Sequence, residues 1–277
     1  MKNLFNLYFL FNLVFGSGFI ESPQNSINLA RWNGGSASSN IYHQLNPAAL
    51  PIFNVVSFSN IQIPGDISLN SIFISQNFKN YLIKINTTVI DYGRLEDFVT
   101  NKNFNANDLK VDLSIKSTFE EILSLGLQIG YLNRNIENFS KSILVTKFGL
   151  RTQLLEKRLG IGFVLNHSFD DEDKIYSLIG IFYKPIYFPG ELSIDIRGVK
   201  QSEIIFSIIL NINSYFDFSL GFTNDKLKYH TGSTIENIYS GLGLGFNLNL
   251  KSYNLAYGIR NIGQYGVMNG ITLSFNL

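Results

Sequence analysis

From about residue 53 to the end of the chain, large apolar side chains alternate with small or polar ones at a period of two. In the run from Leu123 to Tyr131, leucine, isoleucine and tyrosine occupy every second position, and serine, glycine and glutamine stand between them. The runs from Gly241 to Leu250 and from Phe216 to Phe222 repeat the pattern. Because successive side chains of a β-strand point to opposite faces, each run predicts a strand with one apolar face and one narrow, polar face.

The number of such runs predicts about fourteen strands, an even number, as is usual in closed bacterial barrels. The runs are centred near residues 56, 71, 85, 114, 127, 146, 162, 179, 195, 208, 219, 229, 244, 256 and 272, and we take one of these as spurious. Alternation fits a soluble sandwich or barrel with its apolar face inward as well as a membrane barrel with that face toward lipid. Many runs are long enough for the ~10 residues that cross a bilayer at a tilt, which favours the membrane barrel.

The composition agrees with a surface that partly faces lipid. Charged residues make up 16% of the 277-residue chain, whereas soluble domains usually contain about 25%. The net charge of +1 gives no broad field to attract nucleic acid, and the absence of cysteine excludes disulfides and thiolate sites. We therefore predict that residues 53–277 form a transmembrane antiparallel β-barrel in the outer membrane of a bacterium, in contact with its lipids.

The N-terminal region is predicted to have two parts. Residues 1–18 resemble a signal peptide, with Lys2, an apolar run from Leu4 to Phe15, and small residues at a cleavage site, although an uncleaved anchor is the alternative. Residues 19–52 are rich in asparagine and serine. We expect them to form a short helical or irregular plug in the lumen, with Ser38 or Ser39 capping a helical turn that stops before Pro47.

The last run of the chain predicts a signal for the barrel-assembly machinery. Bacterial outer-membrane proteins commonly end on an alternating apolar strand, and here Ile271, Leu273, Phe275 and Leu277 share one face. An ordinary last strand is the alternative.

Turn residues predict which connections are short. Asn213-Ser214, Asn224-Asp225 and the segment near Lys251-Ser252 are expected to be periplasmic hairpins. Longer polar links, from Glu96 to Asp108 and from Asp170 to Lys174, are expected to be outward loops.

No residue pattern predicts an enzyme, a cofactor or a metal site. His43, His167 and His230 lie in separate segments without the spacing of metal ligands. The acidic run from Asp170 to Asp173 lacks the glycine and the ligand spacing of a calcium loop, so a solvated loop tip is favoured.

Two further motifs have a structural and a functional interpretation. The glycines between Gly241 and Gly245 fall at period two within a strand, which favours close packing inside the barrel over a phosphate-binding loop. Lys147, Arg151, Lys157 and Arg158 gather around one predicted hairpin. A solvated hairpin is favoured over a site for lipid phosphates.

The segment before the strands resembles the N-terminal region of the PorV/PorQ family of outer-membrane barrels, which are related in fold to the FadL transporters. The resemblance rests on Ala30, Arg31, Gly34, Gly35, Asn46, Pro47 and Ala48. Further matches follow in the family's order at Asp91-Tyr92-Gly93, Phe104 to Leu109, Ser124-Leu125-Gly126 and Ile136 to Ser140.

The resemblance implies a non-enzymatic role in type IX protein secretion and cell-surface attachment. The partners would then be secretion-system proteins or the C-terminal domains of exported cargo. A FadL-like transporter of small hydrophobic compounds is the alternative, and a soluble secreted β-protein with an apolar ligand site is a third hypothesis. Transport would need large apolar side chains in the lumen, and the glycine, serine and asparagine partners of the strands argue against that.

Overall fold

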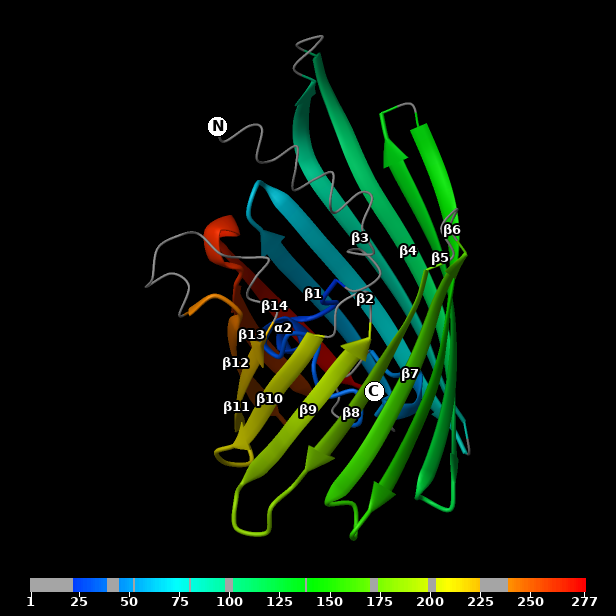
Figure 1. The fold of residues 1–277 in the computed structure, drawn as a ribbon, viewed down its shortest axis with the longest axis vertical. Helices are drawn as coiled ribbons and strands as arrows, with labels where there is room; N and C mark the ends of the chain where they lie inside the picture. Colours follow the sequence, from blue (N-terminus) through cyan, green and yellow to red (C-terminus); the bar gives the residue numbers. More distant parts are fainter. Residues whose placement is uncertain are drawn as a thin grey trace.

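The computed structural model describes residues 22–38, 45–51, 53–79, 81–97, 102–137, 139–169, 174–198, 203–224 and 239–277. Fourteen antiparallel strands form one closed barrel, in which sequence neighbours pair and β1 pairs with β14 (Figure 1). The strands are β1 (Val55–Ile63), β2 (Ile67–Phe78), β3 (Tyr81–Asp97), β4 (Lys102–Phe119), β5 (Leu123–Ile136), β6 (Phe139–Leu154), β7 (Leu159–Phe169), β8 (Lys174–Tyr183), β9 (Gly190–Gly198), β10 (Glu203–Asn211), β11 (Phe216–Thr223), β12 (Leu242–Leu250), β13 (Tyr253–Asn261) and β14 (Val267–Asn276). The predicted all-β barrel is thus confirmed.

The barrel closes without the predicted strand near residue 229. That centre lies outside the described residues, and β11 pairs directly with β12 from Phe216–Leu248 to Phe222–Leu242. The other fourteen predicted centres each fall within one of the strands.

Side-chain burial shows which face of each strand points outward. On β5, Leu127 and Ile129 are 60% and 57% exposed, whereas Gln128 between them is 5% exposed. The same division holds on β1, where Phe58 is exposed and Ser57 and Ser59 are buried. Apolar side chains therefore form the outer surface and small or polar ones fill the lumen, which is the arrangement of a membrane barrel.

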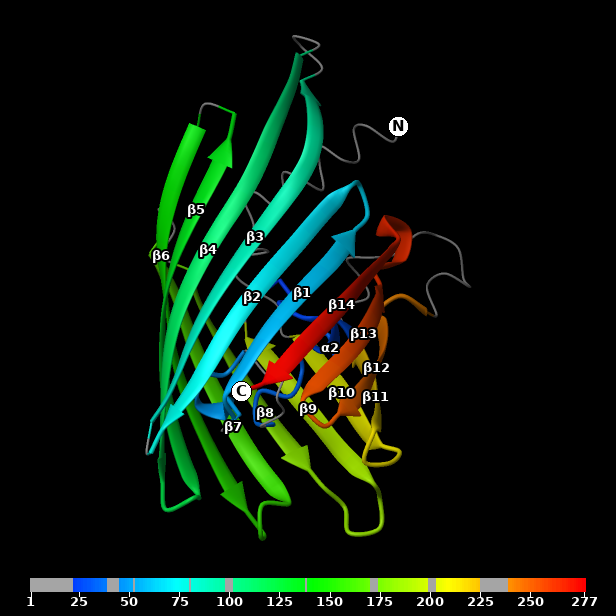
Figure 2. The ribbon, with the colours of Figure 1, turned by 180° about the vertical axis from the view of Figure 1, so that it is seen from behind.

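The wall is much taller on one side than on the other. Strands β3, β4 and β6 contain 17, 18 and 16 residues, whereas β9 to β13 contain only 8 or 9 each. Figure 2 shows β3 and β4 rising past the turn between β1 and β2. Since ~9 to 11 residues cross a bilayer, the long strands extend beyond the membrane.

The connections identify the two ends of the barrel. The end that carries Leu277 has short turns, of which residues 184–189 form the longest, whereas residues 224–241 make a long connection at the opposite end. Short turns mark the periplasmic side of such barrels, so we name these the periplasmic and outer ends. The turns at Asn213-Ser214 and Lys251-Ser252 are periplasmic, as predicted.

Two predictions about connections are wrong. Asn224 begins the long connection at the outer end and is not part of a periplasmic hairpin. Most of the predicted loop from Glu96 to Asp108 is strand, because β3 continues to Asp97 and β4 starts at Lys102. Polar residues there alternate on a strand that extends beyond the membrane, and their polarity therefore does not mark a loop.

Two short helical turns precede the strands. The helix α2 (Ser26–Ala30) is capped by the Asn25 side chain, which accepts a hydrogen bond from the Asn28 N–H. The 3-10 turn η2 (Pro47–Ala49) is capped in the same way by Asn46. Pro47 starts this turn, because proline's fixed φ suits the first helical position. The predicted turn that stops before Pro47 falls on residues 39–44, which lie outside the described residues.

Within the described residues, none of the helices has the length and apolarity to span a membrane. The predicted signal peptide, residues 1–18, and the predicted helix cap at Ser39 lie outside the described residues.

Candidate functional site

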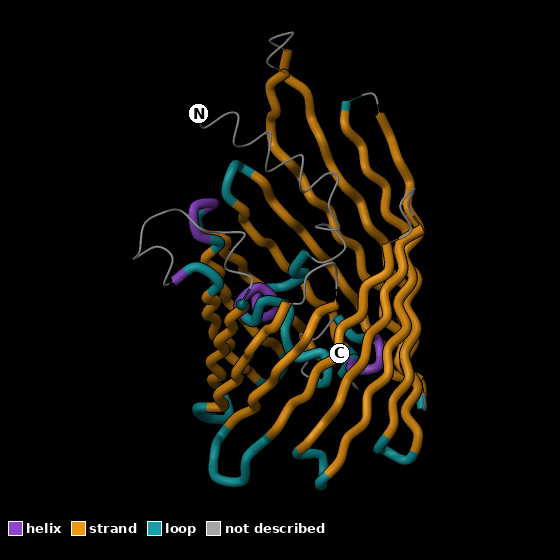
Figure 3. The backbone as a smooth tube through the Cα atoms, in the orientation of Figure 1, coloured by secondary structure: helices purple, strands orange, loops and turns teal. Residues whose placement is uncertain are grey.

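The segment before the strands lies inside the barrel, where it divides the lumen (Figure 3). Helix α2 contacts β11 to β14 and β1, whereas η2 contacts β4 to β7 on the other side. We refer to residues 22–38 and 45–51 as the plug. All residues of α2 and η2 are buried, so the two turns bridge opposite walls of the barrel.

Glycines in the wall let the plug backbone approach closely. A Cβ atom added at Gly243 would lie 2.1 Å from the Ala30 carbonyl oxygen, and one added at Gly126 would lie 2.2 Å from the Pro47 carbonyl carbon. Gly258 stands in the same relation to Ser26. Any larger residue would force the plug away from the wall, so the period-two glycines of β12 serve close packing as predicted.

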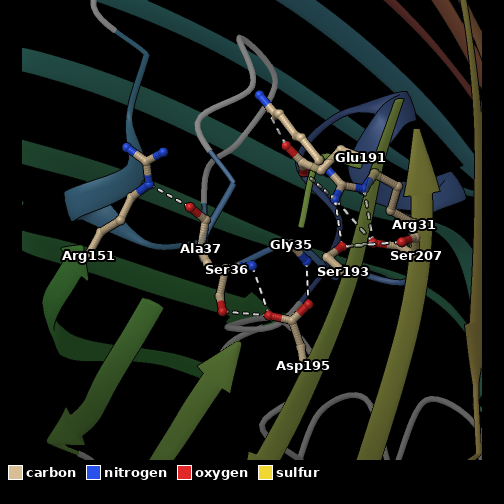
Figure 4. A network of polar contacts seen from close by, with 10 residues as sticks. Arg31, Gly35, Ser36, Ala37, Arg151, Glu191, Ser193, Asp195 and Ser207 are labelled. Atoms are coloured by element: carbon tan, nitrogen blue, oxygen red, sulfur yellow. Dashed lines mark hydrogen bonds and ion pairs between the residues drawn. The ribbon is translucent and has the colours of Figure 1, made fainter. Parts of the chain in front are cut away.

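Three buried wall residues, Asp195, Ser193 and Ser207, hold the middle of the plug (Figure 4). The Asp195 carboxylate accepts hydrogen bonds from the Gly35 N–H at 2.5 Å and from the Ser36 N–H at 2.8 Å, and it also accepts one from the Ser36 hydroxyl. The Arg31 guanidinium donates to the Ser193 and Ser207 hydroxyls, both at 3.1 Å. Hydrogen bonds to charged groups are each worth ~1.5 to 3 kcal/mol, so these contacts fix the loop between the two turns.

The charge of Arg31 is only loosely compensated. Its Nη2 lies 3.6 Å from Glu191 Oε1. Burial lowers the pKa of Arg31 from its ordinary value, and the Glu191 and Asp195 carboxylates oppose that effect. The guanidinium keeps its proton under physiological conditions, so this part of the plug carries a positive charge next to two carboxylates.

Cationic side chains of the wall hold the carbonyls at both ends of the plug. Arg260 donates to the Leu29 oxygen at 2.7 Å and the Asn28 oxygen at 2.9 Å, which caps the C-terminal end of α2. Arg151 donates to Ala37, and Lys116 donates to the carbonyl after η2 at Leu50. These contacts satisfy plug carbonyls that would otherwise be buried without partners.

The outer part of the lumen is apolar. Side chains near the outer ends of β1 to β6, β10 and β14 meet in one buried cluster with Leu29 and Trp32 of the plug, and Arg260 stacks 4.5 Å from the Trp32 ring. We call this cluster the chamber. Its other buried members are Ile61, Ile67, Leu69, Ile90, Tyr92, Ala106, Leu132, Ile143, Val145, Ile205, Ile262 and Met268.

The chamber contradicts the expectation that the lumen lacks large apolar side chains. Small and polar residues line the lumen at plug level, as at Ser59 and Ser71, but the inward residues that follow toward the outer end are Ile61 and Leu69. Barrel interiors are usually polar. The buried apolar cluster on the outer side of the plug is therefore a candidate site for an apolar molecule.

An irregularity in β3 lies in the chamber wall. The pairing of β3 with β4 shifts register between Asp91 and Arg94, and Gly93 takes a positive φ of 69°. Asp91 is also the last residue of β3 that pairs with β2. Beyond it, the described strands leave one edge of β3 unpaired, directly above the turn that joins β1 and β2.

A buried polar group adjoins this bulge. The Tyr92 hydroxyl donates to Asp108 at 3.0 Å, and Arg134 forms an ion pair with the same carboxylate at 3.0 Å. Asp108 is fully buried. Because the carboxylate is neutralised by Arg134 and bound by Tyr92, the group adds little net charge to the chamber.

The structure places every residue of the predicted family motif in the plug. Ala30 packs on Gly243, Gly35 is bound by Asp195, and Asn46 donates to the Ser36 and Leu150 carbonyls. All of Arg31, Asn46, Pro47 and Ala48 are buried. These residues seat the plug, and they present no surface at the outside of the barrel.

The other singled-out residues lie elsewhere. Ile271, Leu273, Phe275 and Leu277 share the outer face of β14 or follow it. The His167 ring packs against the Phe169 ring in a tilted arrangement, with ring centroids 4.1 Å apart. His43, His230 and Asp170–Asp173 lie outside the described residues, and within the described part of the chain no cluster of side chains could hold a metal ion.

The predicted basic cluster around one hairpin is wrong. Lys147 and Arg151 point into the lumen and are 3% and 4% exposed. Only Lys157 and Arg158 are in the turn, where they pair with Glu121 and Glu156. Two of the four basic side chains are on the inward-facing positions of β6, so the four residues form neither a solvated hairpin nor a site for lipid phosphates.

Solved structures with the same architecture exist, although no family model and no curated protein sequence matches the chain. The Ralstonia pickettii toluene transporter TbuX superposes with a TM-score of 0.64 at 11% identity, over 94% of this chain and 100% of that one. The monoaromatic hydrocarbon channel CymD gives 0.65 at 10% identity, over 91% and 97%.

A FadL homologue of Pseudomonas aeruginosa gives a TM-score of 0.57 at 9% identity, over 91% of this chain and 99% of that one. These neighbours are a toluene transporter, a monoaromatic hydrocarbon channel and a FadL homologue, and the likeness to them is one of fold. The chain therefore has the fold of these FadL-type barrels.

Proposed function

We propose that this protein admits small hydrophobic molecules to the outer membrane. The observation that carries the proposal is the apolar chamber, because a lumen that only conducted water and solutes would be lined with polar side chains. The chamber is bounded below by Leu29 and Trp32 of the plug. A molecule that enters from outside would exchange water for apolar walls, at ~25 cal/mol per Å² of apolar surface buried.

The plug disfavours a straight route to the periplasm. Its turns pack on opposite walls, and at Gly126 and Gly243 its backbone lies directly against the strands. The unpaired edge of β3 above the turn between β1 and β2 offers a sideways route instead. A hydrophobic molecule that leaves there enters lipid without crossing water, which suits a cargo of low solubility.

The similar structures are those of a toluene transporter and a monoaromatic hydrocarbon channel, which supports this proposal by analogy of fold alone. The cargo class of this protein is set by its own chamber, which is lined by leucine and isoleucine with a single tryptophan and a neutralised ion pair. We infer that uncharged or weakly polar molecules of modest size are accepted.

The type IX secretion hypothesis derives from the motif residues. Arg31, Asn46 and Pro47 are buried against the wall, so their presence is accounted for by the seating of the plug. A protein partner could not reach them in this structure. The motif therefore gives no separate support for partner binding, and transport remains the function that we propose.

Uptake by whole cells tests the proposal. The chain is expressed in a host that lacks its own barrel of this fold, and accumulation of labelled toluene is followed with and without the protein. Ala106→Phe fills the chamber from β4, whereas Asn105→Phe places the same ring on the outer face of the adjacent position.

We expect the wild type and Asn105→Phe to accumulate toluene several-fold faster than the empty host, and Ala106→Phe to lose most of that gain. Heat-modifiable gel migration verifies that each variant is folded. Equal uptake by the two variants, or no gain from the wild type, would contradict the transport proposal. Co-purification of secretion proteins without uptake would favour the alternative.

A further inference from the structure

A groove lies on the lipid-facing side of the barrel, where β14, β1, β2 and β3 run next to one another (Figure 2). Its volume is about 540 Å³, which is within the range of sites that hold a small molecule. The groove is on the outside of the wall, whereas the plug and the chamber are inside the barrel. What fills the groove is therefore independent of the proposed transport.

Most of the groove is apolar, but two amide side chains lie in its middle. The apolar side chains that line it include Phe58, Ile72, Val89 and Ile271. Between them, Asn60 of β1 is the register partner of Asn70 of β2, and both side chains are exposed on the outer face. We refer to Asn60 and Asn70 as the amide pair.

The apolar band of the wall ends early at the groove. Beyond the amide pair, the next outward residue of β1 is Gln62, whose register partners are Ser68 and Asn269. On β10 and β12, by contrast, the outward residues nearest the outer end are the apolar Ile204 and Leu242. The outward apolar band of a membrane barrel matches the hydrocarbon layer. The border between that layer and the lipid headgroups therefore meets this part of the wall at the amide pair.

The amide pair ends in unused hydrogen-bond donors. Gln62 donates to the Asn60 Oδ1 atom at 3.0 Å, and Asn60 donates to the Asn70 Oδ1 atom at 2.7 Å. The Asn70 amide nitrogen has no acceptor among the described residues. Since an amide nitrogen has two N–H donors to fill, and a polar group left without partners beside lipid is costly, an acceptor is missing at this point.

The missing acceptor and the apolar lining specify one kind of molecule. It needs a chain that covers apolar side chains and, at the polar end of that chain, an oxygen that accepts hydrogen bonds. A carbonyl oxygen accepts without donating, so it complements the free N–H groups of Asn70. An acyl ester lipid has both parts, and its ester lies at the same border between hydrocarbon and headgroups as the amide pair.

We propose that the groove binds one ester-linked lipid of the outer leaflet. The acyl chain lies along Phe58 and Ile271, and the carbonyl oxygen of its ester accepts a hydrogen bond from the Asn70 amide nitrogen. Because Ile271 is on β14 and Phe58 is on β1, the lipid covers the pairing that closes the barrel.

Native mass spectrometry of the full barrel, purified in detergent and freed of lipid, tests this site. The protein is titrated with diacyl phosphatidylethanolamine and with its dialkyl ether analogue, which has the same chains and headgroup but no ester carbonyl. We expect the wild type to bind one ester lipid about 2- to 10-fold more tightly than the ether lipid, because a net hydrogen bond contributes a factor of this size. Asn70→Leu should bind the two lipids equally.

Asn107→Leu is the matched control. Asn107 also accepts an amide hydrogen bond from the neighbouring strand, from Asn135 at 3.2 Å. It is near the outer end of the tall strand β4, beyond the ~9 to 11 residues that cross a bilayer. This variant should keep the preference for the ester lipid. Val89→Trp fills the groove and leaves the amide pair in place, so it should weaken the binding of both lipids several-fold.

Heat-modifiable gel migration verifies that each variant is folded. Equal affinity of the wild type for the two lipids, an ester preference retained in Asn70→Leu, or unchanged binding by Val89→Trp would overturn the proposal. A dimer of the barrel that excludes the lipid and is lost in Val89→Trp would overturn it too, because the groove would then belong to an interface between copies of the chain.

Discussion

Replacement of Gly243 by alanine should unseat the plug without opening the wall. The added Cβ would lie 2.1 Å from the Ala30 carbonyl oxygen, whereas ordinary contacts to a Cβ begin at 3.4 Å, so the plug must move by more than 1 Å. Overpacking of this kind costs ~1 to 3 kcal/mol. Since 1.4 kcal/mol is a factor of ten, the ratio of seated to displaced plug should fall by about 5-fold to 150-fold.

The matched control is Gly198→Ala, because the nearest atom to its Cβ is the Ser177 hydroxyl oxygen at 3.1 Å and the next is at 3.9 Å. The assay is the swelling of liposomes in a small sugar, with folding of each barrel verified by heat-modifiable migration. We expect faster swelling for Gly243→Ala than for the control or the wild type. If both variants remain as tight as the wild type while folded, the contact at Gly243 does not hold the plug in place.

Three further outcomes are expected. Asp195→Leu removes the acceptor of three hydrogen bonds from the plug, so sugar permeability should rise more than in Asp195→Asn, and similar tightness would count against this anchor. Arg134→Met leaves the buried Asp108 carboxylate without its ion pair and should lower the free energy of unfolding in urea by ~3 to 5 kcal/mol. Arg134→Met combined with Asp108→Leu should recover much of this loss. If the losses of the two single variants simply add in the double variant, the pairing is refuted. A hydrogen bond from Lys157 and its charge lower the pKa of Glu121. The ion pair therefore contributes to folding stability above the unfolded pKa of ~4.3, and this contribution is lost as the pH falls. Because Glu121 is fully exposed, Glu121→Gln should leave the unfolding temperature at neutral pH nearly unchanged.

The strands and their faces could be predicted from the sequence because one physical rule governs them. Alternation at Leu127, Gln128 and Ile129 identifies two faces, and only the environment decides which of them meets lipid. Of the fifteen predicted centres, one was expected to be spurious, and the run near residue 229 lies outside the described residues while β11 pairs directly with β12. The turn that begins at Pro47 was not predicted, since proline is read as the end of a helix as readily as its start.

The chamber was not predicted, although one feature of the sequence indicates it. Alternation breaks down near the outer ends of several strands, as in Ile143-Leu144-Val145 and in Tyr131-Leu132, where adjacent residues are both apolar. On a membrane barrel, one of two adjacent apolar residues must face the lumen. Whether such breaks meet in space depends on the register between strands, which the sequence of one chain does not reveal.

The residue type at each inward position of this barrel therefore depends on what the wall contacts at that level of the lumen. Where the neighbour is plug backbone, the wall has glycine, as at Gly126 and Gly243. Where the neighbour is a plug carbonyl, the wall has a cation such as Arg260. Above Leu29 and Trp32, beyond the described residues of the plug, the wall is lined with isoleucine and leucine. Barrel interiors are usually polar, so this apolar lining is the feature of the wall on which the proposed transport of a hydrophobic molecule rests.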